Sequence, residues 1–144
     1  MERVYIFDTT LRDGGQTKGV DFSFADKIAI SEALDDLGID YIEGGWPGAN
    51  PTDDKLFGSP PKLKVSNFVA FGMTRRPNTS AANDPGLNAV LSGKSDSVCL
   101  VGKTWDFHVS KALNITLEEN IDMISESINE INKRGTQELF DLSL

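Results

Sequence analysis

Four short apolar runs recur along this chain at nearly even intervals, and this recurrence constrains the fold more than any other feature. The runs begin at residues 4, 41, 68 and 98, separated by roughly the 30 residues that one strand and one helix occupy. The longer runs are continuously apolar, which is typical of parallel strands buried on both faces. We therefore expect strands at 4–7, 41–42, 68–71 and 98–101 in one parallel sheet.

The segments between these runs carry helix signals. Ser23 and Asp26 suit a capping box, and Gly38 can end the helix that follows. Thr116 and Glu119 suit a second capping box, with Gly135 as the stop. Each helix has apolar residues at helical spacing, which we expect to be buried. These residues are Phe24, Ile28, Leu34 and Leu37 in the first helix, and Leu117, Ile121, Ile124, Ile128 and Ile131 in the last. Shorter helices are expected at 53–57 and 85–91.

The resulting order is a strand and a helix repeated four times, with a further candidate strand at 138–140. Two α/β architectures accept this order: an open doubly wound sheet, or part of a (β/α)₈ barrel. A whole barrel typically needs about 250 residues. In the second case the 144 residues form a single incomplete barrel domain over 1–144.

Charge and composition exclude several classes of protein. A net charge of −8 argues against sequence-independent nucleic-acid binding, which needs a basic surface. No apolar run approaches the roughly 18–20 residues of a membrane span, and we expect no signal peptide. The single cysteine, Cys99, cannot form an internal disulfide and is expected in the core, which fits a reducing, cytoplasmic compartment.

Polar side chains gather directly after the first strand, where parallel α/β folds place their ligands. Arg12 offers a rigid fork of donors for a carboxylate or a polarised carbonyl, and Asp13 offers oxygen ligands for a hard divalent cation. The glycines at 14–15 allow the backbone to approach a ligand closely. The alternative is an Arg–Asp pair in a solvated turn.

Further candidates follow the other strands. Glu43 can point into the same mouth, or can be a hydrogen-bonded interior residue. Arg75 and Arg76 can meet an anionic ligand, or can form a solvated pair in a loop. His108 is the only histidine, and a lone histidine is more often structural than a metal ligand.

Three motifs in this order resemble the metal-dependent Claisen-condensing barrels, which include the 2-isopropylmalate, homocitrate and citramalate synthases and are related to hydroxymethylglutaryl-CoA lyase. The segment at 8–16, DTTLRDGGQ, is similar to the amino-terminal signature of that family. The segments at 42–51, IEGGWPGANP, and 102–109, GKTWDFHV, resemble the citramalate synthase branch.

The resemblance implies a (β/α)₈ barrel that condenses acetyl-CoA with a 2-oxo acid. Pyruvate would give citramalate, and 2-oxoisovalerate would give 2-isopropylmalate, in isoleucine or leucine biosynthesis. It implies that Arg12 stabilises the developing oxyanion and that Asp13 binds a divalent metal (Mg, Mn or Zn). It also implies that Gln16 and Glu43 contact the substrate and that His108 lies near the substrate or CoA entrance.

The sequence departs from the family pattern at several positions. Gly15 stands where the common signature has glutamate, and the late His-x-His pair that completes the metal site is absent. Residues 141–144 lack the expected continuation of a fifth strand. We therefore expect an amino-terminal part of such an enzyme that is weak or inactive alone and retains no metal. The alternatives are a non-catalytic half-barrel or binding module, and an aldolase or lyase of the same superfamily. Open sheet edges and unpartnered apolar stripes predict a homo-oligomer.

Overall fold

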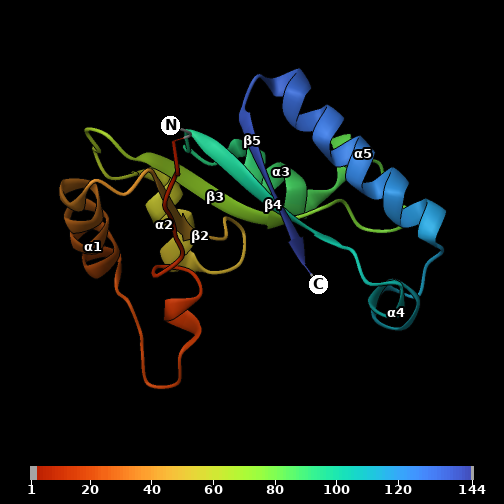
Figure 1. Cartoon of the computed structure of the whole chain (residues 1–144), viewed down its shortest axis with the longest axis horizontal. Helices are drawn as coiled ribbons and strands as arrows, with labels where there is room; N and C mark the ends of the chain where they lie inside the picture. The colour runs from red at the N-terminus through yellow and green to blue at the C-terminus, as the bar shows by residue number, and fades with distance from the viewer. Residues whose placement is uncertain (1–2, 144) are drawn as a thin grey trace.

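A parallel sheet of five strands in sequential order forms the framework of this computed structural model, which describes residues 3–143, with side chains up to residue 136. The strands are β1 (Phe7–Asp8), β2 (Tyr41–Gly45), β3 (Asn67–Met73), β4 (Ser97–Lys103) and β5 (Gln137–Ser143). Each strand pairs in parallel with the next along the chain, so the described sheet has no topological switch point. This order distinguishes the wall of a barrel from a doubly wound sheet (Figure 1).

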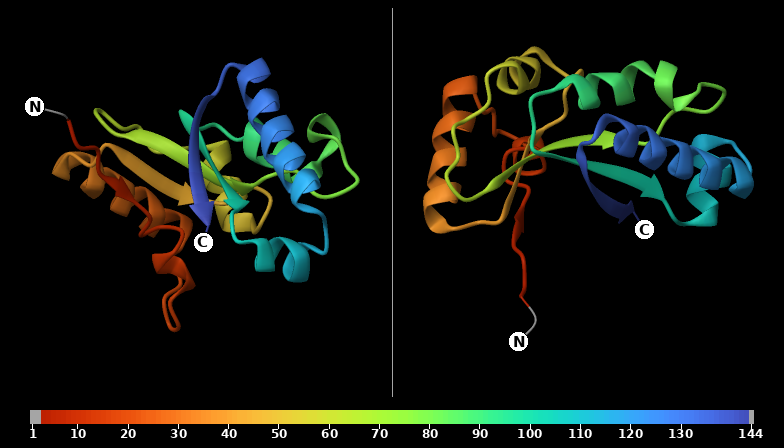
Figure 2. Two further views of the ribbon diagram at one scale, coloured as in Figure 1. Left: turned by 45° about the vertical axis from the view of Figure 1, so that its right-hand side comes forward. Right: turned by 90° about the horizontal axis from the view of Figure 1, so that it is seen from above.

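Helices link the consecutive strands and lie on one side of the curved sheet (Figure 2), as right-handed crossovers require. The main helices are α1 (Phe24–Leu37), α2 (Pro51–Gly58), α3 (Pro85–Ser92) and α5 (Leu117–Arg134). Short helical turns are η1 (Gly14–Gln16), η2 (Ala81–Asn83), α4 (Asp106–His108) and η3 (Val109–Leu113). No described helix is both long and apolar enough to cross a membrane. The predicted helices and the half-barrel architecture are therefore confirmed.

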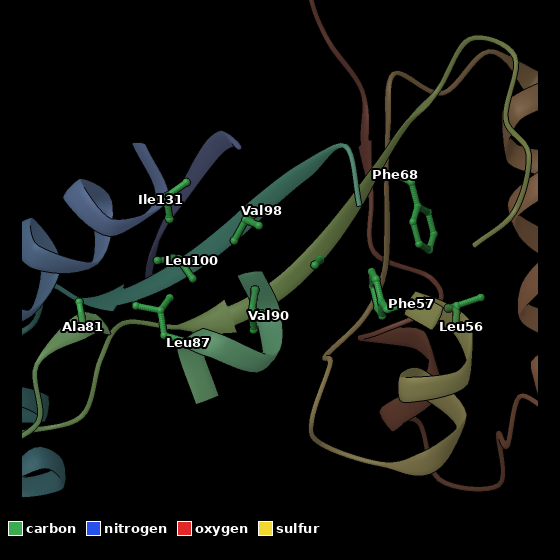
Figure 3. Close-up of a cluster of buried hydrophobic side chains, with 10 residues drawn as sticks. Leu56, Phe57, Phe68, Ala81, Leu87, Val90, Val98, Leu100 and Ile131 are labelled. Atoms are coloured by element: carbon green, nitrogen blue, oxygen red, sulfur yellow. The ribbon is translucent and has the colours of Figure 1, made fainter. Parts of the chain in front are cut away.

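The core lies between the helices and the outer face of the sheet. Leu56 and Phe57 from α2 pack beside Phe68 of β3, and Val90 of α3 packs with Val98 of β4 (Figure 3). The alternate residues of the same strands point to the opposite face, where Cys99 is buried as predicted.

The first strand is shorter and more exposed than its apolar sequence predicts. Only Phe7 and Asp8 pair with β2, and Val4, Tyr5 and Ile6 are exposed. The expectation that this run is buried on both faces is wrong. Its residues lie at the edge of the described sheet, where a strand has a neighbour on one side only.

The buried faces of α1 and α5 also differ from the prediction. On α1 the buried residues are Lys27, Ser31 and Asp35, whereas Leu37 is exposed. On α5 the buried residues are Asn120, Met123, Ser127 and Ile131, whereas Leu117 and Ile121 are exposed. Buried polar side chains are tolerated when they find hydrogen-bond partners, and these do. The Ser127 hydroxyl, for example, accepts from the backbone N–H of Arg75 at 2.9 Å.

The fifth strand continues where the sequence predicted that it would stop. Residues 141–143 of β5 pair in register with Val101, Gly102 and Lys103 of β4. The predicted loss of the strand continuation is wrong for 141–143, and Leu144 lies outside the described residues. Backbone groups make a parallel ladder, so an atypical side-chain pattern does not prevent pairing.

Candidate functional site

A tight turn after β1 presents Arg12 at the carboxyl end of the sheet. The carbonyl oxygen of Thr9 accepts from the backbone N–H groups of Arg12 at 3.1 Å, Asp13 at 2.8 Å and Gly14 at 3.3 Å. The side chain of Leu11 is buried and anchors the turn to the core. From the anchored turn the Arg12 side chain reaches across to β2 and β3.

The Arg12 guanidinium is held from three sides. Its Nε donates to Glu43 Oε2, and its Nη1 and Nη2 donate to Asp13 Oδ1 at 2.7 Å and Oδ2 at 3.1 Å. Its Cζ lies 3.8 Å from the centroid of the Phe71 ring, a cation–π distance. One cation therefore stands between two carboxylates, with its planar fork fixed in orientation.

The two carboxylates around Arg12 have different environments. The Glu43 side chain is 1% exposed, whereas that of Asp13 is 52% exposed. A buried carboxylate needs a partner for its charge. The ion pair with Arg12 supplies that partner for Glu43 and at the same time orients the guanidinium. Asp13 retains a face open to solvent and can exchange partners.

A cavity of about 340 Å³ opens beside Arg12, between the turn after β1 and the loop from β2 to α2. Gln16 lines this cavity together with Trp46 and Asn50. The structure thus brings Arg12, Asp13, Glu43 and Gln16 to one place, as the sequence predicts. A cavity with fixed polar groups over an aromatic wall is typical of a small-molecule site.

His108 lies apart from this group, in α4 after β4. Its ring packs against those of Trp105 at 4.6 Å and Phe107 at 6.4 Å, measured between centroids. Its Nδ1 is buried without a hydrogen-bond partner, and the residue does not line the Arg12 cavity. Within the described residues, His108 is not assembled with the other predicted site residues.

The paired arginines after β3 serve the structure of the loop. Arg75 is buried and donates to Glu126 at 2.6 Å and Glu119 at 2.9 Å, both on α5. Arg76 donates through Nε to Asp84 at 3.1 Å. Arg75 is therefore neither solvated nor open to an anionic ligand, whereas the Arg76 side chain is paired with Asp84 and is 65% exposed. The capping box expected at Thr116 and Glu119 is formed only in part. The Thr116 hydroxyl accepts from the Glu119 backbone N–H, but the Glu119 carboxylate binds Arg75.

A buried ion pair next to the cavity escaped the sequence analysis. Lys27 Nζ donates to Asp53 Oδ1 at 2.5 Å, and both residues line the cavity. The spacing of Lys27, Ser31 and Asp35 is helical, but a polar stripe normally indicates a solvated face. The helical spacing of these three residues was therefore visible in the sequence, but their polar side chains suggested an exposed face and not a buried one.

The described residues do not make up a metal centre. Among them, no group of three or more His, Cys, Asp or Glu side chains is arranged to hold a metal ion. Asp13 is a suitable oxygen ligand, but both of its oxygens accept from Arg12. Ca²⁺ takes six to eight oxygen ligands and Mg²⁺ six, so any such ion at Asp13 would need further ligands from water, substrate or other residues.

Comparison with known proteins gives one family. The HMGL-like family matches residues 3–143. The (R)-citramalate synthase of Aquifex aeolicus is 49% identical over 142 residues, covering 97% of this chain. That of Sulfolobus acidocaldarius is 44% identical over 140 residues, covering 96%. The 2-isopropylmalate synthase of Bradyrhizobium diazoefficiens is 35% identical over 135 residues, covering 91%.

Solved structures agree on the fold. The HMG-CoA lyase of Bacillus subtilis superposes with a TM-score of 0.73 at 21% identity, over 97% of this chain and 46% of that one. The chain thus spans about half of a lyase barrel, and it spans 27% of the citramalate synthases. The resemblance read from the three motifs is confirmed, and the chain belongs to the HMGL-like family.

Proposed function

We propose that this chain supplies the arginine-bearing part of an active site that condenses acetyl-CoA with a 2-oxo acid. The observation that carries the proposal is the Arg12 fork, fixed by buried Glu43 at the carboxyl ends of the strands. Pyruvate is the preferred oxo acid, giving (R)-citramalate. In support, the citramalate synthases are 42–49% identical to this chain, whereas the 2-isopropylmalate synthases are 30–35% identical.

The reaction makes one carbon–carbon bond and cleaves one thioester. A base takes a proton from the methyl carbon of acetyl-CoA, and that carbon attacks the keto carbon, whose π electrons move onto the keto oxygen. The keto oxygen then takes up a proton and becomes the hydroxyl group. Water then hydrolyses the thioester, releasing CoA and the hydroxy diacid. Arg12 has five N–H groups, and its Nη atoms each retain one beyond those bound to Asp13. One of those N–H groups donates to the developing oxyanion, while Glu43 keeps the fork in plane.

The other predicted residues take roles around this centre. Gln16 and Glu43 shape the substrate side of the cavity, and His108 lies near the CoA entrance. Asp13 is one ligand for a divalent metal, whose remaining ligands must come from outside the described residues. We further propose that residues 1–144 form one incomplete barrel domain.

A non-catalytic half-barrel is the second candidate function. The observation that favours it is the lack of a complete metal-binding group among the described side chains. A lyase of the same superfamily has less support, because the lyase structures are at most 21% identical and carry information about the fold alone.

The proposal is tested in two settings. For the 144-residue chain, we expect CoA release from acetyl-CoA and pyruvate, with Mg²⁺ or Mn²⁺, to be absent or very weak. Turnover within the usual enzyme range of roughly 1–10³ s⁻¹ would contradict that expectation. In the second setting, residues 3–143 replace the matching segment of the Aquifex aeolicus enzyme, and we expect this chimera to form citramalate.

The chimera also assigns Arg12. Arg12→Lys keeps the charge but loses the planar fork, so we expect turnover to fall by about 10²–10³. Arg76→Lys is the matched control, because Arg76 binds Asp84 outside the cavity. A chimera that folds and is inactive favours the non-catalytic half-barrel. Full turnover in Arg12→Lys contradicts the role of Arg12.

A further inference from the structure

Strand β2 contains a β-bulge directly behind the candidate site. Glu43 pairs with Val69 of β3 and Gly45 pairs with the next residue, Ala70, so Gly44 is the extra residue. A bulge disrupts the ladder locally and re-aims the side chains beside it. Glu43, which holds Arg12, lies just before this bulge, and Trp46, which lines the cavity, lies just after it, so the placement of both depends on the shape of the bulge.

One buried ion pair ties the two sides of the bulge together. Lys27 Nζ donates to the Gly44 carbonyl oxygen at 3.0 Å and to Asp53 Oδ1 at 2.5 Å. Asp53 Oδ2 accepts from the Trp46 backbone N–H and from Asn50 Nδ2, each at 3.0 Å. The Lys27 and Asp53 side chains are 8% and 7% exposed. Every polar contact of this pair is therefore directed at the bulge or at the loop after it.

Stability alone does not account for this arrangement. Burying two charges has a desolvation penalty, and well-packed apolar residues of similar size are often as stable or more so. The local backbone is also built around the Asp53 carboxylate: a Cβ on Gly45 would lie 2.6 Å from it, at a φ of +152°. Only glycine leaves room for the carboxylate at that position. Because the backbone at Gly45 leaves space for the Asp53 carboxylate, we infer that this carboxylate serves to fix the local backbone geometry.

We propose that Lys27 and Asp53 are positioning residues that hold the β2 bulge in the shape the site requires. Through the Gly44 carbonyl they fix the strand end that carries Glu43, the partner of Arg12. Through the Trp46 N–H they fix the start of the loop that closes the cavity. The inference rests on the proposed function only in treating the Arg12 cavity as a substrate site.

The test uses the whole 144-residue chain and ¹⁵N NMR hydrogen exchange. Asp53→Asn removes one charge, and Lys27→Gln with Asp53→Asn removes both, so that no unpaired charge stays buried. We expect exchange of the Trp46 amide and of Arg12 Nε–H to accelerate tenfold or more relative to amides of central β3. The matched control is Asp35→Asn, since Asp35 is equally buried and accepts backbone N–H groups ahead of β3.

Three results would overturn the positioning role of Lys27 and Asp53. Unchanged relative exchange at Trp46 and Arg12 in a folded double variant overturns the proposal. An unfolded double variant also overturns it, because the pair would then serve the fold as a whole. So does an equal acceleration in Asp35→Asn. Citramalate formation by the chimera is a separate measurement: a folded, inactive chimera contradicts the proposed function and leaves the exchange result standing.

Discussion

Helices α1 and α5 occupy equivalent places, α1 between β1 and β2 and α5 between β4 and β5, yet they bury different kinds of surface. Both begin at a hydroxyl N-cap and end at a glycine with positive φ. Both carry apolar residues at helical spacing. Helix α1 buries a polar stripe of Lys27, Ser31 and Asp35, whereas α5 leaves part of its apolar stripe exposed. Equivalent position therefore does not dictate which face is buried.

The difference lies in what the neighbouring loops require. The Asp35 carboxylate accepts the backbone N–H groups of Lys64 at 2.8 Å, Val65 at 3.0 Å and Ser66 at 2.8 Å, in the segment before β3. Lys27 instead donates, to the Gly44 carbonyl oxygen near the end of β2. Helix α1 thus supplies polar partners at both ends of the neighbouring crossover, which runs from β2 through α2 to β3. Loops without internal hydrogen bonds select the helix face that can satisfy them.

The largest effect is expected within α5 itself. Ile131 is 1% exposed in the core cluster, whereas Ile121 of the same helix is 63% exposed. Ile131→Ala removes buried methyl groups and leaves a cavity, so we expect unfolding to become easier by about 2–5 kcal/mol. Ile121→Ala is the paired control, with an expected change within about 0.5 kcal/mol. Urea denaturation at low protein concentration measures both. Equal losses would mean that the exposed stripe is covered.

Helix α1 gives a pH-dependent effect instead. Burial alone would raise the pKa of Asp35, but the N–H groups of Lys64, Ser66 and Val65 more than offset it and hold that pKa well below its usual range. Because its pKa is lower in the folded than in the unfolded state, the ionised carboxylate stabilises the fold above an unfolded pKa of about 3.9. That stabilisation is lost progressively as the pH falls below about 4.

The variant Asp35→Asn isolates this contribution. We expect it to unfold more easily than the unmodified chain at pH 7, with the difference narrowing as the pH falls toward the folded pKa. Urea midpoints measured from pH 7 to pH 2 give the comparison. A difference that stays constant across this range would show that the lost contacts, and not the charge, are responsible.

Sequence patterns predicted the helices and the later strands because these depend on short-range signals. Caps and glycine stops define α1 and α5 within a few residues, and continuous apolar runs define β3 and β4. The pattern overestimated β1, because apolar content does not reveal whether a strand has a neighbour on both sides. It underestimated β5, because backbone pairing tolerates an atypical side-chain sequence.

The residues of the candidate site could be predicted from the sequence, but the hydrogen bonds and ion pairs that hold them could not. Arg12, Asp13 and Glu43 follow strands that end at one edge, so their proximity follows from topology. The bulge after Glu43 and its anchor at Lys27 arise from contacts between α1, β2 and α2, which no local pattern records. Arg75 looked like a ligand-binding residue because its partners on α5 lie 44 and 51 positions away along the chain.

The exposed stripe on α5 leads to a prediction about assembly. Glu118 and Asp122 flank its beginning and Lys133 flanks its end, so an antiparallel pair of α5 helices would place opposite charges together. We therefore expect a homo-oligomer at micromolar concentration. Ile121→Lys places a charge in the stripe and should weaken association at least about tenfold, or 1.4 kcal/mol. Leu37→Lys, on the exposed face of α1, should have no effect. Sedimentation of a monodisperse, unmodified monomer would contradict the expectation.

The smallest effect concerns the two N-caps. Ser23 forms a complete capping box with Asp26, whereas Thr116 only accepts the Glu119 backbone N–H. Replacing a hydroxyl N-cap by alanine costs typically about 1 kcal/mol. We expect Ser23→Ala to lose at least as much stability as Thr116→Ala, because it removes the hydroxyl that also donates to Asp26 Oδ2 at 2.6 Å. Thermal melting of both variants checks the order. A larger loss from Thr116→Ala would show that the Arg75 contact of Glu119 depends on the α5 cap.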